Sequence, residues 1–397
     1  MEKTNSILVC NAGSSSIKID MYSLDSPDMA PIMTLALENV GTERTLLRTK
    51  SADSTSEERS VVAENQDEAI KIATDWLNRN IDPSQIVAVG HRIVHGGERF
   101  TGPEVMNDSE LGELRSLIEL DPEHLPSAIR LVEAMAGQYG GVPQVGCFDT
   151  AFYKDMPRIA KMIPIPRKYE AMGVRRYGFH GLSYEYLMNY LKTTCGETAS
   201  MGRVICAHLG SGVSMTAIKN GIPVDTTMGF TPASGVMMSK RSGDIDPGLI
   251  PFLERQTHMS TEEIYDELTQ KSGLLGVSET TPDMYDLLQS EGEDERAHEA
   301  VDLFCYQIRK MIGAYSAVLG GVDSIIFSGG MGENAPRIRN RVVAGLEYLG
   351  VEIDDELNQQ GSECISSETS RVGVHVFHTD EGRTIYNQVK EIIFNPS

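Results

Sequence analysis

Arginine, histidine and carboxylate side chains gather in a few short, glycine-containing segments of this chain. Residues 91–99 read HRIVHGGER, so two arginines and two histidines surround a pair of glycines directly after an apolar run. Arginine binds a carboxylate or a phosphate through parallel N–H groups. The formal net charge is −22, and an acidic protein that binds anions must gather its cations at one place. We therefore interpret residues 91–99 as an anion-binding segment.

Two further segments place cations beside glycines or carboxylates. Residues 175–181 read RRYGFHG. Residues 225–248 read DTTMGFTPASGVMMSKRSGDIDPG, in which Arg241 lies close to Asp244 and Asp246. Cations beside carboxylates suit the handling of Mg²⁺ and phosphate. A salt-bridged loop without a catalytic role is the alternative.

Two glycine-rich turns offer hydrogen-bond donors to phosphate oxygens. Residues 11–16 read NAGSSS and are followed by Lys18, but the GxxxxGK[ST] pattern of a Walker A loop is absent, and a solvated serine-rich turn is the alternative. The apolar run 322–327 is followed by SGGMGEN and by a predicted helix from Ala335. A strand, a glycine loop and a helix suit nucleotide binding, because glycines let a ligand approach the backbone and a helix start offers N–H groups to anions.

Hydrophobic periodicity predicts the elements that position these segments. Strands are predicted at residues 6–10, 17–22, 86–91, 142–148, 204–208, 214–218 and 322–327, and helices at residues 67–79, 108–118, 125–135 and 296–319. Residues 48–68 are polar and indicate a surface loop or an edge hairpin. The strand at 142–148 delivers Asp149 at its end, where a lone aspartate is more often a helix cap or a turn former than a metal ligand.

The opening hairpin recurs near the middle of the chain. Gly13-Ser14 lies in the first turn and Gly210-Ser211 in the second, about half the chain apart, and Asn220-Gly221 predicts a further tight turn. We interpret this recurrence as a faint internal duplication that gives two similar lobes. The alternative is coincidence, because glycine-serine turns are common between strands.

Length and composition narrow the class of protein. A chain of 397 residues exceeds one ordinary core, so we expect two domains. No apolar stretch of about 18 residues occurs, so no membrane span is expected, and residues 1–11 lack the pattern of a signal peptide, so we expect a cytoplasmic protein. The acidic charge argues against nucleic-acid binding. The six cysteines form no CxxC pair and are interpreted as buried, reduced thiols.

Eight motifs, taken in order along the whole chain, resemble the acetate kinase family. They are NAGSSSIK, HRIVHGGE, FDTAF, RRYGFHGLS, DTTMGFTP, RSGDIDPG, FSGGMGEN and the late Thr-Asp-Glu at residues 379–381. The resemblance implies an α/β fold of the two-lobed actin-like, ribonuclease-H-like kind, duplicated, with an interdomain active-site cleft. It also implies a homodimer and a reversible, Mg²⁺-dependent, direct in-line transfer of a phosphoryl group from ATP to acetate, giving acetyl phosphate and ADP.

The resemblance also implies domain bounds and residue roles. The N-terminal lobe would span residues 1–150, with a C-terminal helix at about 382–397 packed back on it, and the C-terminal lobe, with the nucleotide site and the dimer interface, would span 151–381. The catalytic residues would be Arg92, Asp149, His180 and Arg241, and the acid would contact Arg92, Val94, His124, Phe179 and Pro232. The nucleotide and its phosphates would contact Asn11, Ser14, Ser16, Lys18, His208, Gly210, Ser211, Gly212, Asp283, Gly329, Gly330, Gly332, Glu333 and Asn334. Mg²⁺, for which Mn²⁺ may substitute, would be associated with Asn11, Asp149 and Glu381.

Several positions depart from the family pattern. Ser211 replaces the usual Asn, Glu123 and Leu125 flank His124 where the family has Leu and Asn, and Tyr285 replaces an Arg on the nucleotide side. These changes touch the nucleotide and acid pockets, so we expect the transfer chemistry to be kept while the preferred donor or acid differs. The alternatives are a propionate or other short-chain carboxylate kinase, a pyrophosphate-dependent enzyme, a sugar kinase of the same fold, and a nucleotide-binding protein without catalysis.

Overall fold

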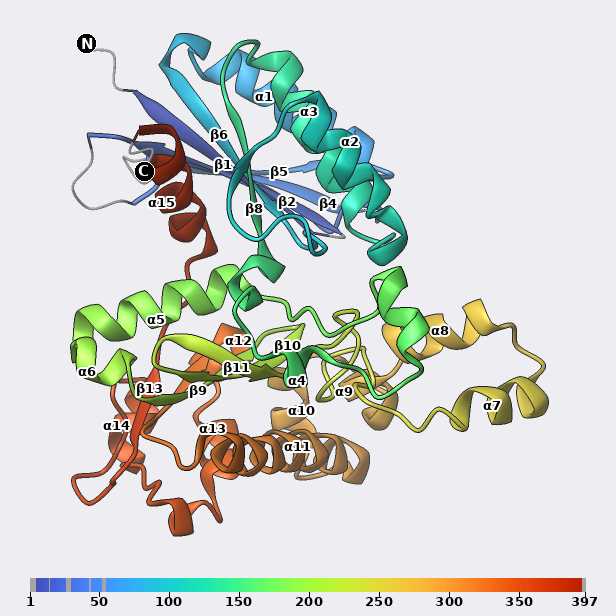
Figure 1. Ribbon diagram of the computed structural model, residues 1–397, viewed down its shortest axis with the longest axis vertical. Coiled ribbons are helices and arrows are strands. Elements are labelled where there is room, and N and C mark those ends of the chain that lie inside the picture. Colours follow the sequence, from blue (N-terminus) through green and yellow to red (C-terminus); the bar gives the residue numbers. More distant parts are fainter. Residues whose placement is uncertain (1–4, 14, 26–29, 43, 52–54, 395–397) are drawn as a thin grey trace. The chain divides into compact units, whose positions relative to one another are not determined.

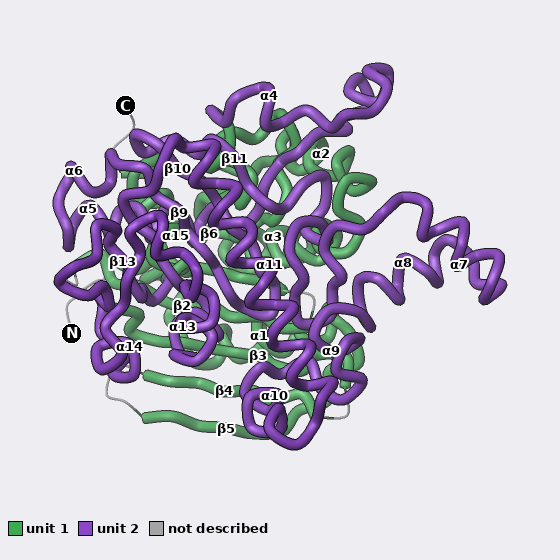
Figure 2. The backbone as a smooth tube through the Cα atoms, turned by 90° about the horizontal axis from the view of Figure 1, so that it is seen from below, with its two compact units in different colours: residues 1–154, 380–397 green, residues 155–379 purple. Residues whose placement is uncertain are grey.

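The computed structural model describes residues 5–13, 15–25, 30–42, 44–51 and 55–394. The chain divides into two compact units, which Figure 2 shows in different colours. Unit 1 comprises residues 1–154 and 380–397, and unit 2 comprises residues 155–379. Each unit is built around its own β-sheet, and each is described here by itself.

Unit 1 is built on an eight-stranded sheet formed by its described residues. Its strands are β1 (Ser6–Ala12), β2 (Ser16–Ser23), β3 (Met33–Glu38), β4 (Thr45–Ser51), β5 (Ser56–Val61), β6 (Ile86–Ile93), β7 (Glu104–Val105) and β8 (Gln144–Phe148), in the order β5-β4-β3-β2-β1-β6-β8-β7. Strands β1, β6 and β8 run parallel, whereas β1 to β5 form an antiparallel meander. The polar residues 48–68 include the hairpin β4–β5 at the sheet edge, which confirms one of the two structures predicted for them.

Helices cover both faces of this sheet (Figure 1). They are α1 (Gln66–Asn80), α2 (Asp108–Ser116), α3 (Leu125–Gln138) and α15 (Glu381–Phe394), with short 3₁₀ segments at Pro83–Gln85, Ile118–Leu120 and Asp149–Tyr153. Helix α1 starts where the Asn65 side chain accepts the Glu68 N–H, and it buries the predicted stripe that contains Ile70, Ala73 and Leu77. Helix α15, the last of the chain, packs on β6 and β1.

Unit 2 repeats the central part of the unit 1 sheet. Its strands are β9 (Arg203–Leu209), β10 (Val213–Lys219), β11 (Ile222–Thr226), β12 (Ser324–Ser328) and β13 (Gly373–Val376), in the order β11-β10-β9-β12-β13. An antiparallel meander β9–β10–β11 is followed by the parallel strands β12 and β13, as β1–β2–β3 is followed by β6 and β8. This shared connectivity confirms the predicted internal duplication. Asn220 and Gly221, with φ of 54° and 74°, form the tight turn expected between β10 and β11.

Several helices of unit 2 pack on this sheet, whereas the helix pair at residues 249–270 extends away from it (Figure 1). The helices of unit 2 are α4 (Arg158–Lys161), α5 (Gly181–Cys195), α6 (Glu197–Ser200), α7 (Leu249–Thr257), α8 (Thr261–Gln270), α9 (Gly273–Ser278), α10 (Met284–Ser290), α11 (Glu295–Leu319), α12 (Gly329–Asn334), α13 (Pro336–Val343) and α14 (Asp355–Gln360), with 3₁₀ segments at Arg167–Met172 and Glu347–Leu349. The long helix predicted at 296–319 is α11, and Gly320 ends it with a φ of 74°. The glycine segment after β12 was predicted as a loop and is instead the short helix α12.

The structure bears on two expectations from composition, namely the absence of a membrane span and the burial of the cysteines. Among the described residues, no helix is both long enough and apolar enough to cross a bilayer. All six cysteines are free thiols, but Cys195 and Cys364 are exposed. The prediction of buried thiols is therefore wrong for these two, which lie at the end of α5 and in the segment between α14 and β13.

Candidate active site

Four predicted residues of unit 1 meet around the guanidinium of Arg92. Arg92 Nη2 lies 2.7 Å from Asp149 Oδ2, Nε donates to Oδ1 at 3.2 Å, and Nη1 lies 3.2 Å from Glu381 Oε2. Asn11 accepts from Arg92 Nη1 at 3.3 Å and donates through Nδ2 to Glu381 at 3.1 Å. Asn11, Arg92 and Asp149 lie at the carboxyl ends of the parallel strands β1, β6 and β8, the edge where open α/β sheets bind ligands.

The charges of this cluster are mutually dependent because the cluster is largely buried. The Asp149 side chain is only 1% exposed and that of Arg92 is 16% exposed. Burial opposes the charge of Arg92, but attraction to Asp149 and then to Glu381 outweighs burial and raises the pKa of Arg92 above its ordinary value. Arg92 is therefore a permanent cation held by two carboxylates.

The same oxygens suit the hard cation that the family resemblance implies. Asn11, Asp149 and Glu381 offer one amide oxygen and two carboxylates, and Mg²⁺ is commonly held by one or two carboxylates together with waters and substrate phosphates. The described residues hold no cluster of three or more His, Cys, Asp or Glu side chains that would form an all-protein cage. The donor set fits a Mg²⁺ ion that is completed by nucleotide phosphates, although both carboxylates bond Arg92 in this structure.

The other basic residues of segment 91–99 do not face this cluster. Burial lowers the pKa of His91 and of His95 to about 4, so both rings are uncharged at neutral pH. His91 Nε2 bonds Gln144 Oε1 at 2.8 Å, and Arg99 forms surface ion pairs with Glu104 and Glu113. Of the four basic residues in the predicted anion-binding segment, only Arg92 therefore presents its charge to this cluster.

Four further predicted residues of unit 1 that the structure describes are Ser16, Lys18, Val94 and His124. Ser14 lies outside the described residues, and Ser16 begins β2. Lys18 Nζ pairs with the buried Asp20 at 2.9 Å. Val94 is half-buried directly after β6, and the His124 ring bonds Asp121 Oδ1 at 2.8 Å.

The two departures that flank His124 differ in exposure. Glu123 is exposed and Leu125 is buried. Leu125 starts α3 and belongs to a core cluster with Phe100 and Phe148. Leu125 therefore has a packing role that the motif comparison alone did not indicate.

A second cluster of predicted residues lies in unit 2, around Gly212. A methyl group at Gly212 would lie 3.4 Å from His180 Cε1, 3.5 Å from His180 Nε2 and 3.5 Å from Arg241 Nη1. The His208 ring packs on His180 with centroids 4.6 Å apart, and Gly210 approaches His208 Nε2. The motifs at 175–181, 208–212 and 225–248 thus converge on Gly212, where a nitrogen of an imidazole and a nitrogen of a guanidinium lie within 3.5 Å of the same point.

The loop that carries Arg241 is closed by backbone contacts. The Met238 N–H donates to the Arg241 carbonyl at 3.0 Å, and Arg241 Nη1 donates to the carbonyl of Pro232 at 3.4 Å. Gly243 has a φ of 75°, and a Cβ there would lie 2.5 Å from the Gly235 carbonyl oxygen, so the loop requires glycine at this position. Asp244 Oδ1 accepts the Gly235 N–H at 2.8 Å and thereby shapes the loop.

The carboxylate of Asp246 has a similar structural use. Its Oδ1 accepts the Gly248 N–H at 2.7 Å. Asp244 and Asp246 are therefore turn-forming residues in this structure, which corresponds to neither the Mg²⁺ interpretation nor the salt-bridged alternative.

A buried arginine, Arg339, hydrogen-bonds to the backbone of the predicted nucleotide-binding segment. Arg339 is fully buried and donates to the carbonyls of Gly332 and Glu333 at 2.8 and 3.0 Å, and to Asn358. At the front of α12, the Gly329 N–H donates to Glu333 Oε1 at 2.8 Å. Arg339 was not among the predicted residues, although an arginine that follows the glycine motif within a few positions was a signal for it.

The remaining predicted nucleotide residues lie on the surface of unit 2. Gly330, Ser211 and Asn334 are exposed, and Asn334 donates to the Gly330 carbonyl at 3.0 Å. The Asp283 side chain caps α10 by accepting the Tyr285 N–H, and Tyr285 is 70% exposed. Phe179, predicted as a wall of the acid pocket, is 1% exposed.

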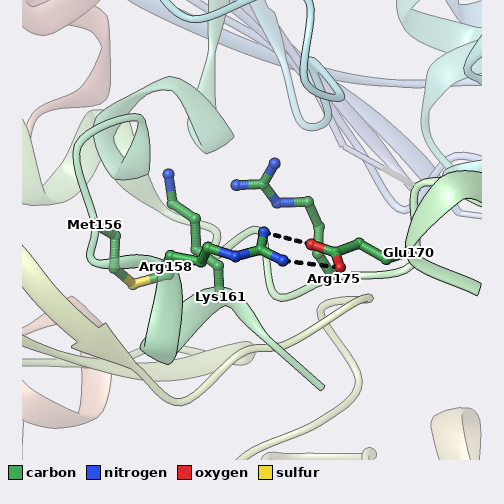
Figure 3. Close-up of a pocket in the computed structure, with 5 residues that line it drawn as sticks. All are labelled: Met156, Arg158, Lys161, Glu170 and Arg175. Atoms are coloured by element: carbon green, nitrogen blue, oxygen red, sulfur yellow. Dashed lines mark hydrogen bonds and ion pairs between the residues drawn. The ribbon is translucent and has the colours of Figure 1, made fainter. Parts of the chain in front are cut away.

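A separate basic pocket lies on unit 2 (Figure 3). It is lined by Met156, Arg158, Lys161, Glu170 and Arg175. Arg158 binds Glu170 through two hydrogen bonds of 2.5 and 3.0 Å, and this contact lowers the pKa of Glu170. Lys161 and Arg175 extend to the same side of that pair (Figure 3). None of the predicted site residues lines this pocket, so it is not the candidate active site.

Comparisons with known proteins bear on the whole chain. The model of the acetokinase family matches residues 6–387. The acetate kinase of Rhodopseudomonas palustris is 39% identical over 389 residues, which cover 96% of this chain and 97% of that protein. The acetate kinase of Methanosarcina acetivorans is 39% identical over 397 residues, covering 97% and 96% of the two chains.

Solved structures show the same relationship. The crystal structure of Porphyromonas gingivalis acetate kinase has a TM-score of 0.89 at 34% identity and covers 98% of this chain and 100% of that one. A propionate kinase from Francisella tularensis has a TM-score of 0.90 at 32% identity and covers 98% and 99%. Together with the duplicated sheet, these likenesses confirm the predicted α/β fold of the two-lobed, actin-like kind. This chain belongs to the acetokinase family.

Proposed function

We propose that this protein is a Mg²⁺-dependent acetate kinase, which transfers a phosphoryl group reversibly between ATP and the carboxylate of acetate. Relatives at 39% identity that cover nearly the whole chain are named acetate kinases, and the chain is a phosphotransferase with a carboxyl group as acceptor. The observation that carries the proposal is that His180 Nε2 and Arg241 Nη1 both lie close to Gly212. Phosphoryl transfer needs hydrogen-bond donors gathered where negative charge develops.

The unit 2 cluster would bind the phosphoryl group during transfer. His180 Nε2 and Arg241 Nη1 both lie 3.5 Å from the position that a Cβ on Gly212 would take, so both donors border the space beside this glycine and would reach oxygens of one phosphoryl group there. The small glycine leaves room for the oxygens, since a side chain there would fill the space between the two donors. The acceptor carboxylate is already an anion at neutral pH, so the reaction needs no general base and no protein nucleophile.

The unit 1 cluster would serve the acceptor and the metal. Asn11, Asp149 and Glu381 would hold Mg²⁺, which neutralises charge on the phosphate oxygens when it is bound. Arg92, released in part from these carboxylates, would bind the acceptor carboxylate through two parallel N–H groups, as it binds Asp149 in this structure. The ion pairs of Arg92 with these carboxylates fix the positions of the three side chains relative to one another.

The proposed acid-binding residues suit a short aliphatic acid. Val94, Phe179 and Pro232 are apolar and would pack on the methyl group of acetate. One extra methylene changes binding by only about 1–3 kcal/mol, so propionate is a natural second substrate. The structural likeness to a propionate kinase makes propionate kinase activity the second candidate function.

We also propose a homodimer in the cytoplasm. One face of α11 exposes Leu303, Tyr306 and Val318, which are 39%, 58% and 54% exposed, and Tyr348 is 69% exposed. Exposed large apolar side chains on one helix are typical of a protein–protein interface. Light scattering of the purified protein tests this proposal, since a monomer at assay concentrations would contradict it.

The assay that tests the function traps acyl phosphate with hydroxylamine. Mg²⁺-ATP would be supplied with acetate, propionate and butyrate in parallel, and acetyl hydroxamate above the no-enzyme control is the expected result. Product with propionate in large excess over product with acetate would favour the second candidate. No product with any acid and ATP, followed by product with pyrophosphate, would identify a change of donor. No product with either donor would contradict the proposal and favour a nucleotide-binding protein without catalysis.

A further inference from the structure

The ring of His180 is attached at Nδ1 to a buried pair of hydroxyl groups. Ser214 Oγ, on β10, lies 2.9 Å from His180 Nδ1 and 2.5 Å from the hydroxyl of Tyr184. Ser214 and Tyr184 are both fully buried. Tyr184 lies in the first turn of α5, which His180 directly precedes, and the Ser214 hydroxyl links the two side chains.

The direction of the hydrogen bonds follows from the acidity of the two hydroxyls. A phenol, with a pKa of about 10, is a far stronger donor than the aliphatic alcohol of serine. Tyr184 therefore donates to Ser214 Oγ, and the single proton of Ser214 is directed to its other partner, His180 Nδ1. A neutral imidazole that accepts at Nδ1 carries its own proton on Nε2.

We propose that Ser214 and Tyr184 are positioning residues that hold the imidazole of His180 with its proton on Nε2, so that an uncharged ring still donates to the transferring phosphoryl group. Nε2 is the ring nitrogen that lies, with Arg241 Nη1, 3.5 Å from the point beside Gly212. This inference rests on the role proposed above for His180 and extends it to two residues outside the family motifs noted in the sequence.

The arrangement preserves the donor when the ring is protonated. The protonated ring would donate from Nδ1 to Ser214 Oγ, which can take this part because a hydroxyl accepts as well as donates. Nε2 keeps its proton in both states. A carboxylate in the place of Ser214 would instead favour the charged ring, since it accepts only and attracts the positive charge.

The backbone at His180 adds an independent reason for the contact. His180 has φ 57° and ψ 26°, in the left-handed region that a side chain with a Cβ seldom adopts. Such a conformation persists only where surrounding contacts hold it. The bond from His180 to Ser214 ties this strained residue at the start of α5 to the central part of the sheet.

The direct test is the tautomer of His180 in the full-length protein. Protein labelled with ¹⁵N at histidine would be studied by NMR, with His180→Gln used to assign the His180 signals. The expected spectrum has a protonated Nε2 and an unprotonated Nδ1. Tyr184→Phe should shift the Nδ1 signal toward a mixture of tautomers, because Ser214 then has no donor to direct it. The matched control is Tyr190→Phe on the same helix, whose hydroxyl donates to Glu363 and not to Ser214.

Kinetics test whether the tautomer matters for transfer. Ser214→Ala should lower kcat by roughly 10–100-fold and Tyr184→Phe by about 10-fold, as for groups that orient a functional imidazole. KM for acetate should change less than about twofold, because the interaction is made in the transition state. Ser214→Thr, which keeps the hydroxyl, should recover most of the rate, whereas Tyr190→Phe should leave it unchanged.

Two results would overturn the inference. One is a wild-type His180 with its proton on Nδ1. The other is a Tyr184→Phe or Ser214→Ala protein that folds normally, with unchanged tautomer and unchanged kcat. The proposed function fails separately, if wild-type protein forms no acyl phosphate, because the spectrum reports the tautomer without turnover.

Discussion

Replacement of Arg241 by alanine should separate catalysis from stability. The hydrogen-bonding contacts of its side chain are weak: a 3.4 Å hydrogen bond to the Pro232 carbonyl and a 3.9 Å contact to Met238 Sδ. A hydrogen bond at that length lies at the low end of the usual net contribution, so we expect a loss of about 0.5 kcal/mol in the free energy of unfolding. For a domain of this size that corresponds to about 1–2 °C in Tm.

The expected loss of activity is much larger. Removing one donor from a group that stabilises transition-state charge commonly lowers kcat by about 10²–10³-fold, which is about 2.7–4 kcal/mol. Arg241 Nη1 and His180 Nε2 border the same space beside Gly212. An alanine at position 241 would be too short to reach the oxygens of a phosphoryl group bound there. Initial rates from the hydroxylamine assay and thermal unfolding of the same preparation give both numbers.

Arg176 offers the matched control. It lies in the segment RRYGFHG, but its Nη1 donates to the carbonyls of Thr226 and Thr227 at 2.9 and 3.0 Å. Arg176→Ala should therefore lower Tm by more than Arg241→Ala and lower kcat by less. The reasoning about Arg241 is refuted if its alanine variant loses thermal stability in proportion to activity, or keeps a kcat within about threefold of wild type.

Three further predictions concern unit 1. Asp149→Asn, which keeps the size but removes the charge, should raise the Mg²⁺ concentration needed for half-maximal rate by roughly 10-fold or more, because one of the two carboxylate ligands is lost; an unchanged Mg²⁺ dependence contradicts the assignment. Burial lowers the pKa of His91 to about 4 from an unfolded value near 6.5, so the unfolded chain binds the proton first as pH falls. The free energy of unfolding should therefore keep its full contribution from this residue above pH 6.5. It should lose at most about 3 kcal/mol of that contribution as pH falls toward 4. Urea unfolding across that range should show a shallower loss in His91→Gln. Gly90→Ala should destabilise unit 1 by about 1–3 kcal/mol, because a Cβ there would lie 2.6 Å from Ile385 and Val389 of α15, whereas Gly137→Ala, with nothing within 4 Å, should stabilise α3 slightly.

The regular elements could be predicted from local pattern, and the charge states could not. The seven predicted strands and the helices α1 and α11 lie within two residues of their predicted bounds, because one buried face suffices to define each of them, whereas β3, β7, β11 and β13 were not predicted. The histidines of HRIVHGGER resemble cations in the sequence, but burial leaves His91 and His95 neutral. Burial depends on tertiary packing, which the local sequence does not contain.

Contacts between distant residues were accessible only through the family resemblance. Arg92 meets Asp149 and Glu381, which are 57 and 289 positions further along the chain, and no local pattern joins them. The hydroxyl pair behind His180 was missed for a different reason. Ser214 stands in the strand VSMTAIK, where a small polar residue among apolar ones does not stand out, and no local pattern joins it to His180 and Tyr184, which lie 34 and 30 positions earlier.

The duplicated sheet explains why the two units carry different chemistry at equivalent places. Strand β6 of unit 1 corresponds to β12 of unit 2, since each runs parallel beside the first strand of its meander. Strand β6 carries Arg92 near its end, whereas β12 leads into the glycine-rich helix α12. The ends of β1 and β9 likewise correspond: Asn11, near the end of β1, belongs to the carboxylate cluster, and Gly212, in the turn after β9, lies beside His180. One backbone topology thus presents the carboxyl ends of its parallel strands twice, and the proposed function would use the unit 1 copy for a metal and an acid and the unit 2 copy for a phosphoryl group and a nucleotide.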